Sequence, residues 1–353
     1  MLRTIYSLAL LACLCLVVPD ARGGNPDRQG EAGAYELLMN PYARSAGLHT
    51  MTTSSVSGVE AFRLNPAGVA RIQKAQFVAS HAIYLEGTGV NMNAFGFATR
   101  IGKGAFGFSL MSLDFGDIPI TTTDQPEGTG ATFSPSFFNI GLGYAHIFEN
   151  KVSVGVTFRG ISERISNLTA STFAVDAGVQ YVTGENDNFK FGISLRNVGG
   201  RMQFKGEGLS FQTDIPFGSV GYGLAVDNRA AGYELQSVLN LGGSYDFLIG
   251  QKNRLTIVGN FTSNAFSRDQ IGGGLELALT NVLMLRGGYK YEIGQTSANE
   301  EEAPLYSGPS GGVSLEVPLN KEKADSGRFG IDYAYRATRI FGGTHNISVK
   351  LDL

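Results

Sequence analysis

Charged side chains recur at every second position along several segments of the chain, and ion pairing is the chemistry open to them. In one segment Val152, Val154 and Val156 take one parity, whereas Thr157 and Arg159 take the other. A strand places alternate side chains on opposite faces, so the charged positions would share one face. The charged residues with this parity are Arg159, Glu163, Lys190, Arg196, Arg254, Glu276, Arg286, Lys290, Glu292, Asp332, Arg336, Lys350 and Asp352. Acids and bases are mixed among them, which predicts salt bridges rather than a field of one sign.

No group of residues has the spacing of a catalytic or metal site. The four histidines, His49, His81, His146 and His345, are scattered, and none has a cysteine at ligand spacing. None shares a strand face with a serine that would serve as a nucleophile. The run from Gly272 to Gly274 lies inside an alternating strand, whereas a phosphate-binding loop stands between a strand and a helix. We therefore expect no enzyme activity, no cofactor and no metal.

The composition excludes several classes of protein. The 353 residues carry 28 basic and 31 acidic side chains, a formal charge of −3, so the chain offers no basic field for nucleic acid. With 43% hydrophobic residues it is too apolar for a disordered protein. Its 48 glycines are about twice the usual share and indicate many short, crowded strands.

Residues 1–23 have the features of an export signal. Arg3 precedes an apolar run from Ile5 to Val18, and residues 21–23 place small side chains where signal peptidase reads them. The sequence up to Cys13 also fits a lipoprotein cleavage site, although apolar residues follow Cys13 where a polar tether is expected. After this segment no apolar run approaches the roughly 18 residues of a membrane helix, so any membrane crossing falls to strands.

From Ala75 to the C-terminus, apolar and polar residues alternate with period two. The links between these segments tend to be short and long in alternation. The short links are Ile101 to Gly104, Glu149-Asn150, Gly184 to Asp187, Gly250 to Asn253 and Thr280-Asn281. The longer links are Gly116 to Pro135, Gly199 to Gly232, Gly294 to Gly308 and Thr338 to Thr344. Short turns on one rim and long loops on the other are typical of an outer-membrane barrel, with periplasmic turns and extracellular loops.

The links divide residues 75–353 into about fourteen antiparallel strands, an all-β transmembrane barrel. The predicted starts are near Ala75, Thr88, Ala105, Phe137, Lys151, Thr169, Asn188, Tyr233, Arg254, Asp269, Val282, Pro309, Arg328 and His345. An even number suits a barrel that begins and ends on the periplasmic side. The segment from Phe217 to Val226 also has strand composition, but we assign it to the Gly199 to Gly232 link because a fifteenth strand would break this parity.

Residues 24–74 lack sustained alternation and are rich in Ser, Thr, Ala and Gly. A barrel of fourteen strands is wider than its wall side chains can fill, so we expect this segment to form a hatch inside the lumen. The alternative is a flexible periplasmic tail, in which apolar residues such as Phe62 would stay exposed to water. The candidate hatch residues are Arg44, Asn65, Pro66 and Gly68, with Pro66 and Gly68 fixing a turn and Asn65 bonding the wall.

Five motifs carry a resemblance to a known family. They are Arg44-Ser45-Ala46-Gly47, Asn65-Pro66-Ala67-Gly68-Val69-Ala70, Phe115-Gly116-Asp117-Ile118-Pro119, Asp176-Ala177-Gly178-Val179-Gln180-Tyr181 and Leu195-Arg196-Asn197-Val198-Gly199. In their order and spacing they resemble the PorV/PorQ outer-membrane proteins of Bacteroidetes, over nearly all of the chain after the signal. The chain departs from the usual pattern of an outer-membrane strand by ending in Leu353 rather than Phe.

The resemblance implies both a fold and a function. PorV/PorQ proteins are similar to FadL, the long-chain fatty acid channel, which implies a fourteen-stranded barrel with an N-terminal hatch. It also implies a part in type IX secretion, with outer-membrane lipid, the translocon channel subunit and the C-terminal signal domains of cargo proteins as partners.

Two functions stay open, and a third is disfavoured. The first is a non-enzymatic PorV/PorQ-type component in the outer membrane that binds exported cargo or docks at the translocon. The alternative is a FadL-like channel for hydrophobic small molecules such as long-chain fatty acids. A fatty acid channel should enclose an apolar pocket. In the predicted barrel, the charged residues that share one strand parity would face inward, into the lumen. Their mixed charges therefore favour the first function. A soluble β-sandwich adhesin would leave the sorting of loop lengths unexplained.

Overall fold

The computed structural model describes residues 24–353 except 216–221, 251, 281, 296–304, 307 and 321–326. The predicted signal, residues 1–23, and the acidic run Glu300 to Glu302 lie outside the described residues. Among the described helices, none is long and apolar enough to cross a membrane.

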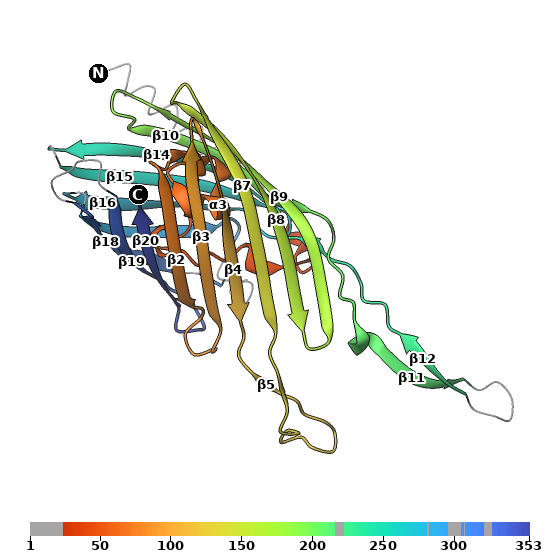
Figure 1. The fold of residues 1–353 in the computed structure, drawn as a ribbon. Helices are drawn as coiled ribbons and strands as arrows, with labels where there is room; N and C mark the ends of the chain where they lie inside the picture. Colours follow the sequence, from red (N-terminus) through yellow and green to blue (C-terminus); the bar gives the residue numbers. More distant parts are fainter. Residues whose placement is uncertain are drawn as a thin grey trace.

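Fourteen antiparallel strands form a closed barrel within the described part of the chain, as predicted (Figure 1). The barrel closes where β2 pairs with β20, in register from Gln76 with Asp352 to Ile83 with His345. The barrel strands are β2 (Ala75–Ile83), β3 (Asn91–Ile101), β4 (Gly104–Asp114), β7 (Ser136–Phe148), β8 (Val152–Ile165), β9 (Leu168–Thr183), β10 (Phe189–Gly199), β14 (Val238–Ile249), β15 (Asn253–Asn264), β16 (Gln270–Leu279), β17 (Leu283–Glu292), β18 (Pro309–Pro318), β19 (Arg328–Arg336) and β20 (Thr344–Asp352).

Two predicted strand starts differ from the structure by more than one residue. The strand expected near Thr88 starts at Asn91, because Gly87 and Gly89 adopt positive φ in the preceding turn. The strand expected near Tyr233 starts at Val238, because Tyr233 bridges Met202 and the next two residues pair with the hatch.

The long links build two hairpins that project beyond one rim, which we call the long-loop rim; the opposite one is the short-turn rim (Figure 1). One hairpin pairs β5 (Ile118–Pro119) with β6 (Thr132–Phe133), and the other pairs β11 (Ser210–Ile215) with β12 (Tyr222–Asp227). The described part of the segment from Phe217 to Val226 therefore belongs to a loop hairpin and not to the barrel. One link on the long-loop rim is short, namely Ser166-Asn167. It joins β8 and β9, the longest strands described, which have 14 and 16 residues.

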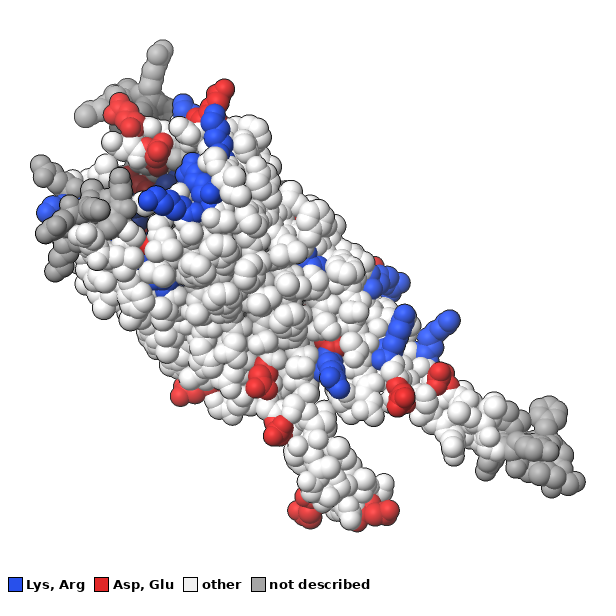
Figure 2. Space-filling view, viewed as in Figure 1, with Lys and Arg blue, Asp and Glu red and all other residues white. Residues whose placement is uncertain are grey.

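Apolar side chains face outward and polar side chains face the lumen. Within β8, Phe158 is 66% exposed whereas its neighbour Arg159 is 1% exposed. Figure 2 shows charged side chains gathered mostly toward the two ends of the barrel, with a largely uncharged band between them. An apolar band of this kind matches the hydrocarbon core of a bilayer.

Residues 24–74, the hatch, lie inside the barrel and contain only short elements. These are η1 (Pro26–Arg28), β1 (Ala32–Gly33), η2 (Tyr35–Leu37), α2 (Ala43–Ala46), η3 (Gly58–Glu60), α3 (Ala61–Leu64) and η4 (Pro66–Arg71). Val59, Phe62 and Val69 of the hatch pack with small wall residues such as Ala98 and Ala145 in one buried cluster. The hatch is therefore part of the hydrophobic core.

Wall glycines let the hatch backbone come close. A Cβ on Gly155 of β8 would collide with the Pro66 backbone, and a Cβ on Gly178 of β9 would collide with the Asn65 side chain. Any larger residue at either position would push the hatch away from the wall, which accounts for part of the high glycine content.

Candidate functional site

The predicted hatch residues Asn65, Pro66 and Gly68 lie against the wall formed by β8 and β9. The Asn65 side-chain amide donates to the carbonyl oxygens of Thr53 (2.8 Å) and Val179 (3.2 Å), and its Oδ1 accepts from Ala67 N–H at 3.2 Å. Pro66 begins η4, where its missing N–H costs nothing, and Gly68 has no room for a Cβ beside the Val56 carbonyl. One amide side chain thus caps a hatch helix and binds the wall.

A cluster of arginines holds the hatch at its middle. Arg159 donates to the Phe62 carbonyl at 2.8 Å and forms an ion pair with Asp176 at 2.6 Å, and both side chains are buried. Arg196 donates to the carbonyl of Arg63, which in turn donates to the Met39 carbonyl. Two predicted lumen-facing residues, Arg159 and Arg196, therefore bind hatch backbone.

A second charged cluster, which we call the Glu276 cluster, lies nearer the short-turn rim. Glu276 Oε2 lies 2.5 Å from Arg286 Nε, and its Oε1 lies 2.8 Å from Arg254 Nη2. Hatch residue Arg44 reaches Glu276 at 3.8 Å and Glu316 at 2.9 Å. Asp332 lies 3.9 Å from Arg286 Nη1. The predicted residues Arg44, Arg254, Glu276, Arg286 and Asp332 thus form one network across four wall strands.

The hatch separates two cavities. The lower cavity, of about 200 Å³, lies on the short-turn side, and most of its lining residues are polar or charged. The charged ones include Arg44, Arg254, Glu276 and Lys190, the last of which forms an ion pair with Asp246 at 2.6 Å. Most of these charges are already neutralised by a partner, so the lower cavity offers little to a ligand.

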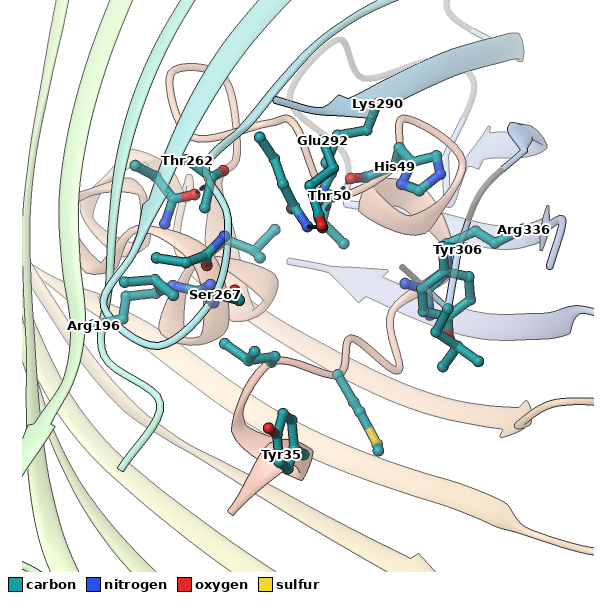
Figure 3. Close-up of a pocket in the computed structure, with 18 of the residues that line it drawn as sticks. Tyr35, His49, Thr50, Arg196, Thr262, Ser267, Lys290, Glu292, Tyr306 and Arg336 are labelled. Carbon is teal, nitrogen blue, oxygen red and sulfur yellow. Dashed lines mark hydrogen bonds between the residues drawn. The ribbon is translucent and has the colours of Figure 1, made fainter. Parts of the chain in front are cut away.

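The upper cavity, of about 370 Å³, lies between the hatch and the long-loop side of the wall (Figure 3). Its residues come from the hatch, from the six wall strands β10, β14, β15, β16, β17 and β19, and from the links after β2, β15 and β17. Its apolar and aromatic lining consists of Tyr35, Leu38, Met39, Leu64, Tyr84, Val238, Leu305 and Tyr306. This lining is the largest difference from the lower cavity.

Three cations and one acid also face the upper cavity: Arg196, Lys290, Arg336 and Glu292. In Figure 3, Arg196 lies on the opposite side from Arg336 and Tyr306. The Arg336 guanidinium stacks 4.2 Å above the Tyr306 ring, and its Nε has no hydrogen-bond partner. Lys290 Nζ reaches only Thr50 Oγ1, at 3.4 Å, among the contacts described. Within the described residues, the positive charge in this cavity is therefore incompletely neutralised.

His49 of the hatch is a neutral member of this lining. Burial lowers its pKa to about 3, and the neighbouring Lys290 and Arg336 act in the same direction. A ring nitrogen of His49 contacts the Gly308 carbonyl at 3.2 Å. The imidazole thus links the hatch to the start of β18 and adds no charge at neutral pH.

The first residues of the hatch, residues 24–40, form a strap that is tied to the long loops. β1 pairs in parallel with β13 (Glu234–Leu235) of the long link before β14. Arg28 forms an ion pair with Glu234 at 3.2 Å and stacks 4.3 Å above Phe266. The strap contributes Tyr35, Leu38 and Met39 to the upper cavity. Movement of these loops would therefore move one wall of the cavity.

The strap also buries a carboxyl group. Glu36 is 2% exposed, and neither of its side-chain oxygens has a hydrogen-bond partner. Burial raises the pKa of Glu36 to about 8, with the nearby Glu163 carboxylate acting in the same direction. Glu163 itself accepts a 2.6 Å hydrogen bond from Tyr233 O–H. Glu36 is accordingly held in its neutral form at pH 7.

The alternation of residues located the wall charges but not the upper cavity. Its lining joins His49, Tyr306 and Arg336, which are far apart in the sequence and carry no shared motif. A signal was available only for the charged wall residues Arg196, Lys290, Glu292 and Arg336, through their inward parity. Within the described residues no three His, Cys, Asp or Glu side chains gather in a way that would hold a metal ion.

Comparison with known proteins identifies the fold. No known protein family matches the sequence, and no curated protein sequence matches it. The solved monoaromatic hydrocarbon channel CymD superposes with a TM-score of 0.53 at 12% identity, over 90% of this chain and 97% of that one. The Pseudomonas putida toluene transporter TodX gives 0.52 at 12% identity, over 85% and 93%. The Ralstonia pickettii toluene transporter TbuX gives 0.51 at 12% identity, over 89% and 97%.

At this level of identity the likeness shows the fold alone. The chain has the same fold as these solved channels, and its own closed barrel holds residues 24–74 in the lumen. Together with the apolar outer band, this places the protein in the outer membrane.

Proposed function

We propose that the protein is a non-enzymatic outer-membrane channel for small hydrophobic molecules, which bind in the upper cavity. The observation that carries the proposal is the upper cavity itself, with its apolar and aromatic lining. Its volume of about 370 Å³ lies within the range of roughly 300 to 1,000 Å³ found for ligand pockets. The similarity in fold to channels for toluene and other monoaromatic hydrocarbons supports the same function.

This proposal reverses the order of preference that the sequence suggested. Mixed charge on the inward parity argued against an apolar pocket. In the structure most of that charge pairs with itself near the short-turn rim, as in the Glu276 cluster. The apolar surface of the cavity comes largely from the hatch and the link after β17, which have no alternation to read. Charge on the wall therefore does not exclude a pocket above it.

The charged lining narrows the range of ligands within this proposal. Three cations face one carboxylate in the upper cavity, and the lining offers a long apolar surface beside them. A molecule with an apolar body and one anionic group would satisfy both, because a charged donor buried without a partner is costly. We infer that anionic amphipaths such as long-chain fatty acids bind more tightly than uncharged hydrocarbons.

Two matched substitutions in one strand test the role of the upper cavity. Thr262 and Thr256 both lie on the inward face of β15, and each donates a hydrogen bond to β14. Thr262 lines the upper cavity and Thr256 the lower one. Thr262→Phe should fill the upper cavity and abolish binding of a labelled fatty acid to the purified barrel in equilibrium dialysis. Thr256→Phe should leave that binding intact.

The same pair tests transport in cells. A host strain without its own fatty acid channel should gain uptake when it expresses the wild type or Thr256→Phe, and not when it expresses Thr262→Phe. Heat-modifiable mobility on gels would show that each variant is folded. Equal binding and uptake by both variants would refute the assignment of the ligand to the upper cavity.

A second candidate function is cargo binding or translocon docking in type IX secretion, which the resemblance to PorV/PorQ supports. The observation that favours it is the pair of hairpins beyond the long-loop rim, where Phe211 and Leu224 are 46% and 48% exposed. Deletion of residues 206–228 should leave the barrel folded. Loss of translocon subunits or exported proteins from a pull-down with this variant, together with unchanged fatty acid uptake, would favour secretion over the channel function.

A further inference from the structure

A groove of about 380 Å³ lies on the outer surface at the short-turn rim, far from both luminal cavities. It crosses the turn ends of β7, β8 and β9 and reaches the turn between β3 and β4. Its main lining residues are Lys103, His146, Phe148, Lys151, Val152 and Tyr181. Neither the proposed channel function nor the resemblance assigns a role to this groove.

The apolar part of the groove faces the membrane. In β7, Tyr144 and Phe148 are 54% and 52% exposed, whereas Ala145 and Ile147 between them are buried, so the even-numbered residues point outward. His146 contacts both neighbours on this face. The Tyr144 hydroxyl lies 3.1 Å from His146 Nδ1, and the ring centroids of His146 and Phe148 are 4.8 Å apart.

These rings mark a membrane interface. Val152 pairs across the sheet with Phe148 on one side and with Tyr181 on the other, which continues the row of side chains to β9. Aromatic rings at the end of an apolar band are the girdle that borders the headgroup region of a bilayer. The groove therefore opens where the polar part of a lipid lies.

Two lysines stand at the polar end of the groove, one on each of two neighbouring turns. Both side chains are exposed, but the backbones that carry them are fixed. The Lys103 carbonyl accepts from Ile147 N–H at 2.9 Å, and the Lys151 carbonyl accepts from Val182 N–H at 2.9 Å and from the Arg71 guanidinium at 3.1 Å. The sheet thus fixes the two backbone positions from which the lysine side chains extend.

The charge of the groove favours an anion. Lys103 and Lys151 are opposed by a single carboxylate, Glu149, in the turn between β7 and β8. An ammonium near a membrane surface attracts an anionic headgroup with about 1 kcal/mol. The rings and Val152 below offer contact to acyl chains, which a free anion in solution would not use.

We propose that this groove binds an anionic glycerophospholipid of the periplasmic leaflet. Lys103 and Lys151 hold the headgroup phosphate, and Phe148, Val152 and Tyr181 pack along the first acyl carbons. Binding at this position would tie the turns of β3–β4 and β7–β8 to the leaflet and set the depth of the barrel there.

Native mass spectrometry of the purified full chain in detergent, titrated with phosphatidylglycerol or phosphatidylcholine, tests the proposal. The wild type should retain phosphatidylglycerol in preference to phosphatidylcholine. Lys103→Gln combined with Lys151→Gln should weaken phosphatidylglycerol binding about 30-fold, which corresponds to about 1 kcal/mol for each lysine. Lys252→Gln, on the turn between β14 and β15 of the same rim, is the matched control and should bind as the wild type does.

Two further arms keep the proposal open to refutation. Glu149→Gln removes the opposing carboxylate and should tighten phosphatidylglycerol binding several-fold, so it tests the site even if the double variant fails to fold. Excess inorganic phosphate should not displace the lipid, because it lacks acyl chains. Equal binding by the double variant, an equal loss in Lys252→Gln, no gain in Glu149→Gln, or displacement by phosphate would each overturn it.

Discussion

The two halves of the lumen use charge in opposite ways. On the short-turn side, Glu276 forms ion pairs with Arg286 and Arg254 of the wall, and Arg44 of the hatch lies 3.8 Å from the same carboxylate. On the long-loop side, Lys290 and Arg336 face a cavity whose described lining holds one carboxylate, Glu292. In both halves, the charged wall residues occupy inward-facing positions of the barrel strands.

The difference separates a structural role from a binding role. Where opposite charges meet within hydrogen-bond distance, they satisfy one another and hold the hatch, and nothing is left for a ligand. Where cations face an open, partly apolar space, an incoming anion gains contacts that the protein does not already make. The lower half thus fixes the hatch, and the upper half retains the capacity to bind.

The largest effect should come from removing the acid at the centre of the Glu276 cluster. Glu276→Gln leaves Arg286, whose side chain is fully buried, without its closest charge partner. Breaking a buried ion pair costs about 3–5 kcal/mol, so we expect a loss of that size in urea unfolding from lipid vesicles. The matched change on the neighbouring strand, Glu292→Gln, should cost less than about 1 kcal/mol, since among the described residues Glu292 accepts a single 3.3 Å bond, from Gln270. Equal losses in the two variants would erase the contrast between the halves.

A smaller effect is expected at Arg44, the hatch member of the cluster. Its side chain is 32% exposed, so Arg44→Met should cost about 2 kcal/mol, less than a fully buried pair would. Faster cleavage of the hatch by added protease and a higher ion conductance in planar bilayers should accompany the loss. Arg28→Met in the strap removes two exposed ion pairs, with Glu31 and Glu234, and it should change the free energy of unfolding by less than about 1 kcal/mol. A hatch that is released equally by both variants would locate its anchor elsewhere.

The wall was predictable from the sequence because period two fixes the face of every residue in a strand. Once Phe158 is assigned to the lipid face, Arg159 must face the lumen, and the structure places both in this way. The turn residues supplied the strand boundaries, since glycines with positive φ such as Gly102 and Gly184 mark the short links.

The hatch and the upper cavity were not predictable in this detail. The parallel pair of β1 and β13 is two residues long and joins segments about 200 residues apart. No local sequence pattern predicts such a pair. His49 and Tyr306 meet as a perpendicular ring pair at 6.1 Å only because the hatch and the link after β17 fold into the same space. Contacts of this kind depend on tertiary packing and leave no periodicity in the chain.

The pH dependence of the strap tests the upper half of the lumen. The pKa of Glu36, raised by burial to about 8, exceeds its unfolded value of 4.5, so the docked strap binds a proton that the undocked strap releases. The stabilisation is complete below pH 4.5 and is lost as pH rises through 8. Proteolysis of the strap should accelerate from pH 6 to pH 9, and Glu36→Gln should remove most of this change. Glu163 and Arg63, which also face Glu36, stay unchanged in that variant.

The smallest effect concerns ligand choice and compares two lysines. Lys290 faces the upper cavity, whereas Lys190 lines the lower one and is paired with Asp246. If an anionic group binds beside Lys290, Lys290→Gln should weaken binding of a fatty acid about tenfold, the value of one charge-assisted hydrogen bond. The same change should leave an uncharged hydrocarbon of equal length unaffected, because that ligand has no group for the ammonium to meet. Lys190→Gln should alter neither affinity. Equal weakening of both ligands by Lys290→Gln would mean that Lys290 shapes the cavity rather than recognising charge, and weakening by Lys190→Gln would extend the binding site below the hatch.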